Sequence, residues 1–95
     1  MNNNLAIFIP TYNRPKILKS NLVNIIDQAK EFEIPVYISD DSNNKETKTI
    51  IEEYMKNYNF LYYKHNLPSL GHDKNIVSCL SNKEFKYIWL MGDSM

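Results

Sequence analysis

Two kinds of hydrophobic pattern alternate along the chain. Short runs of β-branched and aromatic residues are typical of buried strands, and stretches with apolar residues every three or four positions are typical of amphipathic helices. Leu18, Leu22 and Ile25 follow the helical spacing, and Pro15 before them suits a first helical position. The predicted strands are residues 5–9, 34–39, 60–63 and 87–91, and the predicted helices are residues 15–30, 43–57 and 71–81.

This β-α-β-α-β-α-β order predicts an α/β fold, a three-layer Rossmann-like parallel sheet with helices on both faces. Three local details belong to the prediction. Pro10 ends the first strand because it has no N–H to donate. Asn43 and Glu46 form a capping box at the second helix, and Ile76, Val77 and Leu80 face inward on the third.

The chain has no internal repeat, linker or low-complexity tract, so we predict one domain over residues 1–95. A parallel strand is normally covered on both faces, yet the sequence ends directly after the fourth predicted strand. We therefore expect residues 1–95 to be the N-terminal half of a longer domain, truncated at its C-terminus.

Composition and charge narrow the choice of partners. Lysine and arginine balance aspartate and glutamate at 11 each, so no field of one sign attracts nucleic acid. The single cysteine excludes an internal disulfide, and the polar opening residues lack the pattern of a signal peptide, which predicts a cytoplasmic protein. Since no apolar run approaches the roughly 20 residues of a membrane span, any membrane association is expected to be peripheral.

Polar residues follow the first two predicted strands, at the edge where open α/β sheets bind ligands. No glycine-rich segment follows the first strand, which excludes a dinucleotide fingerprint and a P-loop. Residues 10–14, Pro-Thr-Tyr-Asn-Arg, instead offer hydroxyls, an aromatic face, an amide and a guanidinium for a base, a ribose and a phosphate. Asp40 and Asp41 add acceptors for a pyrimidine imide or for ribose hydroxyls, so the pattern predicts a nucleotide site.

Each of these residues also has a structural interpretation. Asp40 and Asp41 are typical turn acids that favour a following helix through its dipole. Tyr12 can pack against the sheet, and Arg14 can be a solvated loop charge.

Four motifs occur in order: Ile-Pro-Thr-Tyr-Asn-Arg at 9–14, Asp-Asp-Ser-Asn at 40–43, Asn66 with Gly71 and Asn75, and Tyr-Ile-Trp-Leu-Met-Gly-Asp at 87–93. Together they resemble the N-terminal, nucleotide-binding half of family 2 glycosyltransferases with a GT-A fold, in the abequosyltransferase-like subgroup. The resemblance covers almost the whole chain.

The resemblance implies roles for single residues. Thr11 and Tyr12 would contact base and ribose, Asp41 the base, Lys74 the phosphates, and Asp93 a metal or the ribose. The remaining members of the implied nucleotide site are Pro10, Asn13, Arg14 and Asp40. The implied cofactor is Mg²⁺ or Mn²⁺. Where relatives carry two or three acids, this chain reads Gly-Asp-Ser-Met, so Asp93 is the one anionic metal ligand in this motif.

The resemblance also implies an activity. It is the transfer of a sugar from a UDP-sugar or another nucleotide-diphosphate sugar to a glycan or lipid-linked acceptor, in cell-surface polysaccharide synthesis. We expect the catalytic base and the acceptor site beyond residue 95, so the 95-residue chain alone is expected to be inactive and prone to self-association. Two other functions remain open: a nucleotide-binding module without turnover, and a protein-interaction module.

Overall fold

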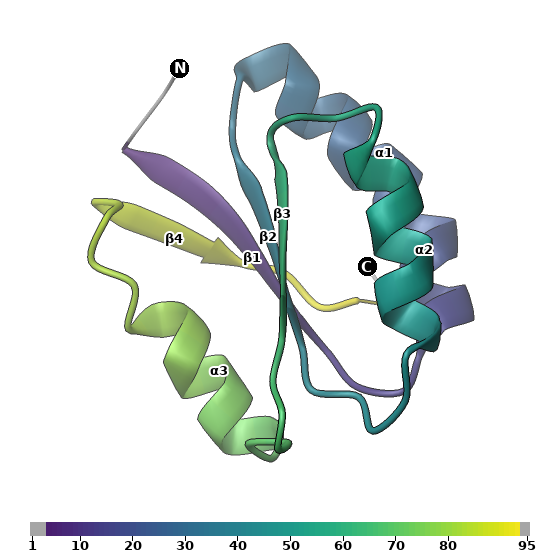
Figure 1. Cartoon of the computed structure of the whole chain (residues 1–95). Coiled ribbons are helices and arrows are strands. Elements are labelled where there is room, and N and C mark those ends of the chain that lie inside the picture. The colour runs from purple at the N-terminus through teal and green to yellow at the C-terminus, as the bar shows by residue number, and fades with distance from the viewer. Residues whose placement is uncertain (1–3, 94–95) are drawn as a thin grey trace.

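Four parallel strands form one sheet, in the order β3-β2-β1-β4, in the computed structural model, which describes residues 4–93 (Figure 1). The predicted α/β class and element order are confirmed. Boundaries differ from the prediction by at most three residues, as is usual at element ends. The elements are β1 (Leu5–Thr11), α1 (Pro15–Phe32), β2 (Val36–Asp40), α2 (Glu46–Met55), β3 (Leu61–His65), α3 (His72–Leu80) and β4 (Tyr87–Leu90).

The two faces of the sheet carry unequal layers. Helices α1 and α2 cover one face, and α3 lies on the other (Figure 1). The α1/α2 layer contains the main core, in which side chains such as Ile9, Leu22 and Ile38 are fully buried. The buried cluster under α3 is smaller and consists of Ala6, Phe8 and Cys79. Within residues 4–93, no helix combines the length and the apolar character that crossing a bilayer requires.

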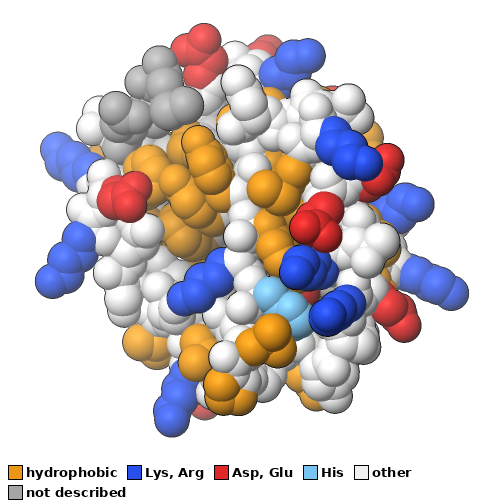
Figure 2. All heavy atoms as spheres, in the orientation of Figure 1, with side chains coloured by type: hydrophobic (Ala, Val, Ile, Leu, Met, Phe, Trp, Pro, Cys, Tyr) orange, Lys and Arg blue, Asp and Glu red, His pale blue; other side chains and the backbone are white. Residues whose placement is uncertain are grey.

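Apolar side chains reach the surface beside β3, and charged side chains surround them (Figure 2). On the α3 face, the rings of Phe8, Tyr37 and Tyr62 stack across three neighbouring strands. The centroid of Tyr37 lies 4.7 Å from that of Phe8 and 4.7 Å from that of Tyr62. These rings line a cavity of about 330 Å³ beside α3. At the opposite edge of the sheet, Tyr87 and Trp89 of β4 are exposed.

The prediction that Pro10 ends β1 is wrong, because the strand continues to Thr11. Ile7 donates its N–H to Pro35 of the chain entering β2, while the Phe8 carbonyl accepts the Met91 N–H after β4. The backbone N–H and C=O groups of odd-numbered residues in β1 therefore point toward β2, and those of even-numbered residues point toward β4. Pairing with β4 ends at Phe8 and Leu90, so the missing N–H of Pro10 removes no hydrogen bond of the ladder.

Two side-chain predictions are also wrong. The predicted capping box of Asn43 and Glu46 does not form, because Lys45 is the cap residue of α2 and makes no side-chain cap bond. The Glu46 N–H is accepted by Oδ1 of Asn44 at 3.0 Å. On α3, Val77 and Leu80 are exposed, and the buried positions are Asn75 and Cys79.

The buried face of α3 is set by a polar contact. Ser39 of β2 donates its hydroxyl hydrogen to Oδ1 of Asn75 at 2.5 Å, and Nδ2 of Asn75 donates to the Ser39 carbonyl at 3.1 Å. These bonds satisfy Asn75 in the interior and turn its side of the helix toward the sheet. Ile76, the third residue predicted to face inward, is half-buried.

Candidate nucleotide-binding site

The carboxyl ends of β1, β2 and β4 meet at one edge of the sheet. Thr11 is the register partner of Asp40, and the Asp41 N–H donates to the Thr11 carbonyl at 2.9 Å. A cavity of about 420 Å³ opens at this edge, which is a volume within the range of ligand sites. Six of the predicted residues line it: Pro10, Thr11, Tyr12, Arg14, Asp41 and Asp93.

The turn after β1 presents Tyr12 and Arg14 at the cavity while Asn13 holds the backbone. Asn13 has a φ of 50°, a left-handed conformation that asparagine tolerates better than most residues. Its N–H donates to Oγ of Ser42 at 2.8 Å, and its Oδ1 accepts the Asn43 N–H at 3.1 Å. Asn13 therefore joins the turns after β1 and β2 and does not line the cavity.

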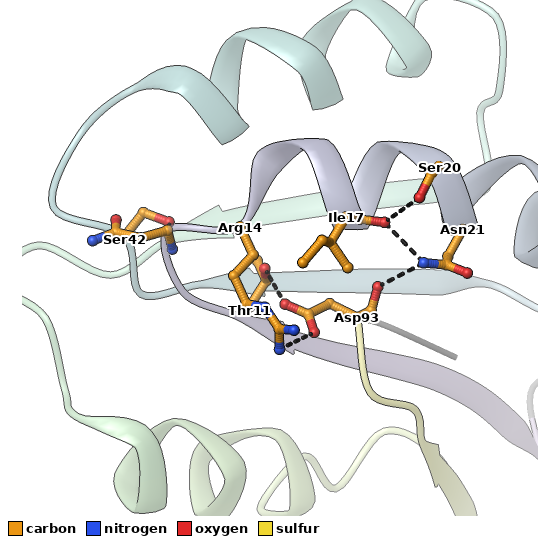
Figure 3. A network of polar contacts seen from close by, with 8 residues as sticks. Thr11, Arg14, Ile17, Ser20, Asn21, Ser42 and Asp93 are labelled. Atoms are coloured by element: carbon orange, nitrogen blue, oxygen red, sulfur yellow. Dashed lines mark hydrogen bonds and ion pairs between the residues drawn. The ribbon is translucent and has the colours of Figure 1, made fainter.

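Asp93 lies at the centre of a network between β1, α1 and the end of β4 (Figure 3). Its Oδ2 accepts a hydrogen bond from the Thr11 hydroxyl at 2.9 Å, and its Oδ1 forms an ion pair with Nη1 of Arg14 at 3.1 Å. The Asp93 carbonyl lies 3.4 Å from the donating Nδ2 of Asn21 on α1. Both carboxylate oxygens of this buried side chain therefore have donors, one of them a cation.

Asp41 has a different set of partners. The N–H groups of Leu70 and Gly71 donate to its Oδ1 and Oδ2 at 2.7 and 2.9 Å. The one hydrogen of the Ser69 hydroxyl faces both the Asp41 backbone carbonyl and Oδ2, and Nδ2 of Asn66 donates to Oδ1 at 3.2 Å. Burial raises the pKa of Asp41, but these hydrogen bonds outweigh it and lower the pKa below its usual value. Asp41 thus holds the loop that leads into α3.

Asp40 is fully buried and points away from the cavity, toward the α1/α2 layer. Its Oδ2 accepts a 2.5 Å hydrogen bond from the Tyr63 hydroxyl, and its Oδ1 accepts the Ser42 N–H at 2.9 Å. Burial and the bond to Asp40 raise the pKa of Tyr63. Lys74 is exposed on α3 and does not line the cavity either. The structure thus brings neither Asp40 nor Lys74 into the cavity with the other predicted residues.

The cavity is also lined by residues that are not among the predicted site residues. His72 and Asn75 come from the first turns of α3, and Leu90 to Gly92 come from the end of β4. The position of His72 at a helix start was the available signal, because helix N-termini favour anions. Asn75 belongs to the third motif, but its buried bonds to Ser39 could not be read from its spacing.

We searched residues 4–93 for side chains that could together hold a divalent cation. They contain no cluster of three or more histidine, cysteine, aspartate or glutamate side chains that could hold a metal ion. Asp93 is paired with Arg14, and both carboxylate oxygens of Asp41 accept N–H groups of the loop at residues 66–71. Ser94 and Met95, the last residues of the fourth motif, lie outside the described part of the chain.

A parallel sheet with polar groups gathered at the carboxyl ends of its central strands defines a ligand-binding α/β fold. The model of the family "Glycosyl transferase family 2" matches residues 6–93, and the chain belongs to this family. Divalent metals are common cofactors in the family.

Curated relatives extend the comparison. The chain is 34% identical to abequosyltransferase RfbV of Salmonella typhimurium over 90 residues, covering 93% of this chain and 27% of that protein. It is 30% identical over 60 residues to chondroitin synthase of Pasteurella multocida, covering 63% of this chain and 6% of that protein. The chain thus spans about a quarter or less of the length of these relatives.

A solved structure bears out the fold. The crystal structure of TarS from S. aureus superposes with a TM-score of 0.75 at 23% identity, covering 96% of this chain and 16% of that chain. The described sheet and its alternating helices therefore match the GT-A fold that the sequence predicted.

Proposed function

We propose that the chain binds the nucleoside diphosphate of a nucleotide sugar, UDP-linked or linked to another nucleoside diphosphate. The protein that contains the chain would transfer the sugar to a glycan or lipid-linked acceptor in cell-surface polysaccharide synthesis. Family membership and the names of the relatives support this proposal. The observation that carries it is the single cavity in which Thr11, Tyr12, Arg14 and Asp93 come together.

The chemistry of these side chains fits the parts of a nucleotide. The Tyr12 side chain is exposed by 50% at the cavity and offers a stacking face to a base. The Thr11 hydroxyl donates its hydrogen to Asp93 and can accept a hydrogen bond from a ribose hydroxyl, and the Arg14 guanidinium suits phosphate. In the transfer reaction, a positive group near the diphosphate stabilises the charge that develops on the leaving group. We assign no acceptor-activating base within residues 4–93.

Three finer proposals accompany this function. We place the protein in the cytoplasm, where its one cysteine stays reduced. We propose that any membrane association is peripheral.

The exposed apolar residues Val77 and Leu80 on α3 favour self-association. The same observation supports a protein-interaction module as the second candidate function. Light scattering of wild type and a Val77→Ser/Leu80→Ser variant tests it, because a monomeric wild type would refute it.

Calorimetric titration with UDP tests the first candidate. We expect Tyr12→Ala to weaken binding by about tenfold, because stacking on an aromatic ring contributes about 1–3 kcal/mol per base. Tyr87→Ala is the matched control, since Tyr87 is also a half-exposed tyrosine but lies at the opposite end of the sheet. Titrations with ADP, CDP and GDP identify the preferred base. A wild-type protein that binds none of the four nucleotides would refute the proposal.

A further inference from the structure

Both carboxylate oxygens of Asp93 are bonded to groups that would compete with a metal ion for them. A Mg²⁺ ion at a nucleotide site is usually held by one or two carboxylates together with phosphate oxygens and water. In this structure Oδ1 of Asp93 is paired with the Arg14 guanidinium, and Oδ2 accepts the Thr11 hydroxyl. A divalent ion at Oδ1 would stand beside a cation that already neutralises the carboxylate, so the two positive charges would compete for one site.

No other described carboxylate at the cavity is free to hold the ion. Asp41 is the second acid in the lining, and its two carboxylate oxygens accept three N–H groups from residues 66–71. A carboxylate offers about four lone-pair positions, and the N–H groups of Asn66, Leu70 and Gly71 take three of them, so this side chain holds its own loop.

Arg14, in contrast, has capacity to spare. A guanidinium carries five N–H donors, and among residues 4–93 the one bond that this side chain makes is from Nη1 to Asp93. The side chain is 48% exposed and lines the cavity, so its remaining donors are accessible to a ligand there. The planar fork of a guanidinium matches two phosphate oxygens, which a compact ammonium group does not.

We propose that Arg14 binds the diphosphate directly and takes the charge-neutralising position that a divalent ion would occupy. Asp93 is then a positioning residue, which orients the guanidinium from behind while Thr11 fixes the carboxylate. Nucleotide binding by this chain would therefore be independent of a divalent metal. The inference rests on the proposed function, because it presupposes that a nucleoside diphosphate occupies the cavity.

The experiment compares UDP with uridine, each titrated into the wild type in EDTA and in MnCl₂. We expect the same UDP affinity in both solutions and a tighter binding of UDP than of uridine. Arg14→Gln should weaken UDP binding by about tenfold or more, since it removes charge-assisted hydrogen bonds, and should leave uridine binding unchanged. Arg14→Lys should restore only part of the loss, because it keeps the charge without the fork.

Two further variants separate positioning from general charge. Asp93→Asn should weaken UDP binding severalfold in EDTA without changing uridine binding, a difference that misfolding would not produce. Lys16→Gln removes an exposed cation two residues from Arg14 that does not line the cavity, and it should bind UDP as the wild type does.

The outcomes distinguish the inference from the function on which it rests. UDP binding that appears or strengthens tenfold with Mn²⁺, and loses this gain in Asp93→Asn, would overturn the inference and keep the proposed function. Equal UDP binding by Arg14→Gln and wild type would also overturn the inference. If the wild type binds neither uridine nor any of UDP, ADP, CDP and GDP in either solution, the proposed function fails, and the inference fails with it.

Discussion

Asp41 and Asp93 are two aspartates on the same cavity, with exposed fractions of only 2% and 6%, but their partners differ in kind. Asp41 accepts hydrogen bonds from neutral groups of one loop. Asp93 accepts one bond from a hydroxyl and one from a half-exposed guanidinium. The difference teaches that burial and position at a strand end do not define the role of an acid. The hydrogen-bond partners of the acid define its role. Asp41 holds the loop before α3 in place, whereas Asp93 is paired with Arg14, which is accessible to a ligand.

Removing the charge of Asp41 should have the largest effect. Asp41→Asn replaces one acceptor oxygen by an NH₂ group that faces the N–H of Leu70 or Gly71, so a part-buried donor loses its partner. We expect a loss of about 3 kcal/mol in the free energy of unfolding, measured by urea denaturation. Asp27→Asn, at an exposed position on α1, is the control and should change stability little. Equal stability of the Asp41 and Asp27 variants would contradict a scaffold role.

The Asp→Asn substitution at Asp93 should lower the free energy of unfolding by less than the same substitution at Asp41. Asp93→Asn keeps an oxygen for the Thr11 hydroxyl and loses mainly the charge attraction to Arg14, which water partly screens. Half-exposed ion pairs contribute little, so we expect a loss of at most about 1 kcal/mol in the same urea experiment. A loss as large as that of Asp41→Asn would show that both acids belong to the scaffold and remove the contrast between them.

Acid should act on stability through Asp41. Because its pKa is lowered on folding, its contribution is present above the unfolded value of about 3.9 and disappears as the pH falls through the folded pKa. We therefore expect the stability gap between wild type and Asp41→Asn to be constant from pH 7 to 5 and to narrow toward pH 3. Urea midpoints at these pH values measure the gap, and a gap that widens in acid would contradict the lowered pKa.

Added salt should have the smallest effect on stability, and it should change only the contribution of Asp93. Raising NaCl from 0.1 M to 1 M shortens the screening length from about 10 Å to about 3 Å, which weakens the exposed Arg14–Asp93 pair. The stability difference between wild type and Asp93→Asn should shrink by a few tenths of a kcal/mol. The difference for Asp41→Asn should stay the same, because its partners are neutral. Equal salt sensitivity of both differences would refute the assignment.

Local sequence sufficed for the fold because each strand and helix is marked by its own residues. It failed where the outcome depends on a neighbour far along the chain. Pro10 stays within β1 because the pairing with β4, some 80 residues later, has already ended. Asn75 rather than Leu80 faces the sheet because it bonds to Ser39, 36 residues earlier.

The site shows the same limit. The rule that open α/β sheets bind ligands at the carboxyl ends of their strands identified Thr11, Tyr12 and Arg14, which the structure places at one cavity. It could not separate Asp40 from Asp41, because adjacent residues of an extended chain point to opposite sides and both fit a turn. Nor could it reveal the donors of Asp41, which come from a loop at least 25 residues away.

Trp89 gives the molecule an optical reporter of its own. It is the one tryptophan of the sequence, and its indole ring is 46% exposed on β4, four residues before Asp93. An indole half in water emits at long wavelength and is open to collisional quenchers, so covering the β4 edge would shift its emission to the blue and slow its quenching by iodide. Fluorescence excited at the red edge of indole absorption therefore follows the strand that leads to Asp93 without any attached dye.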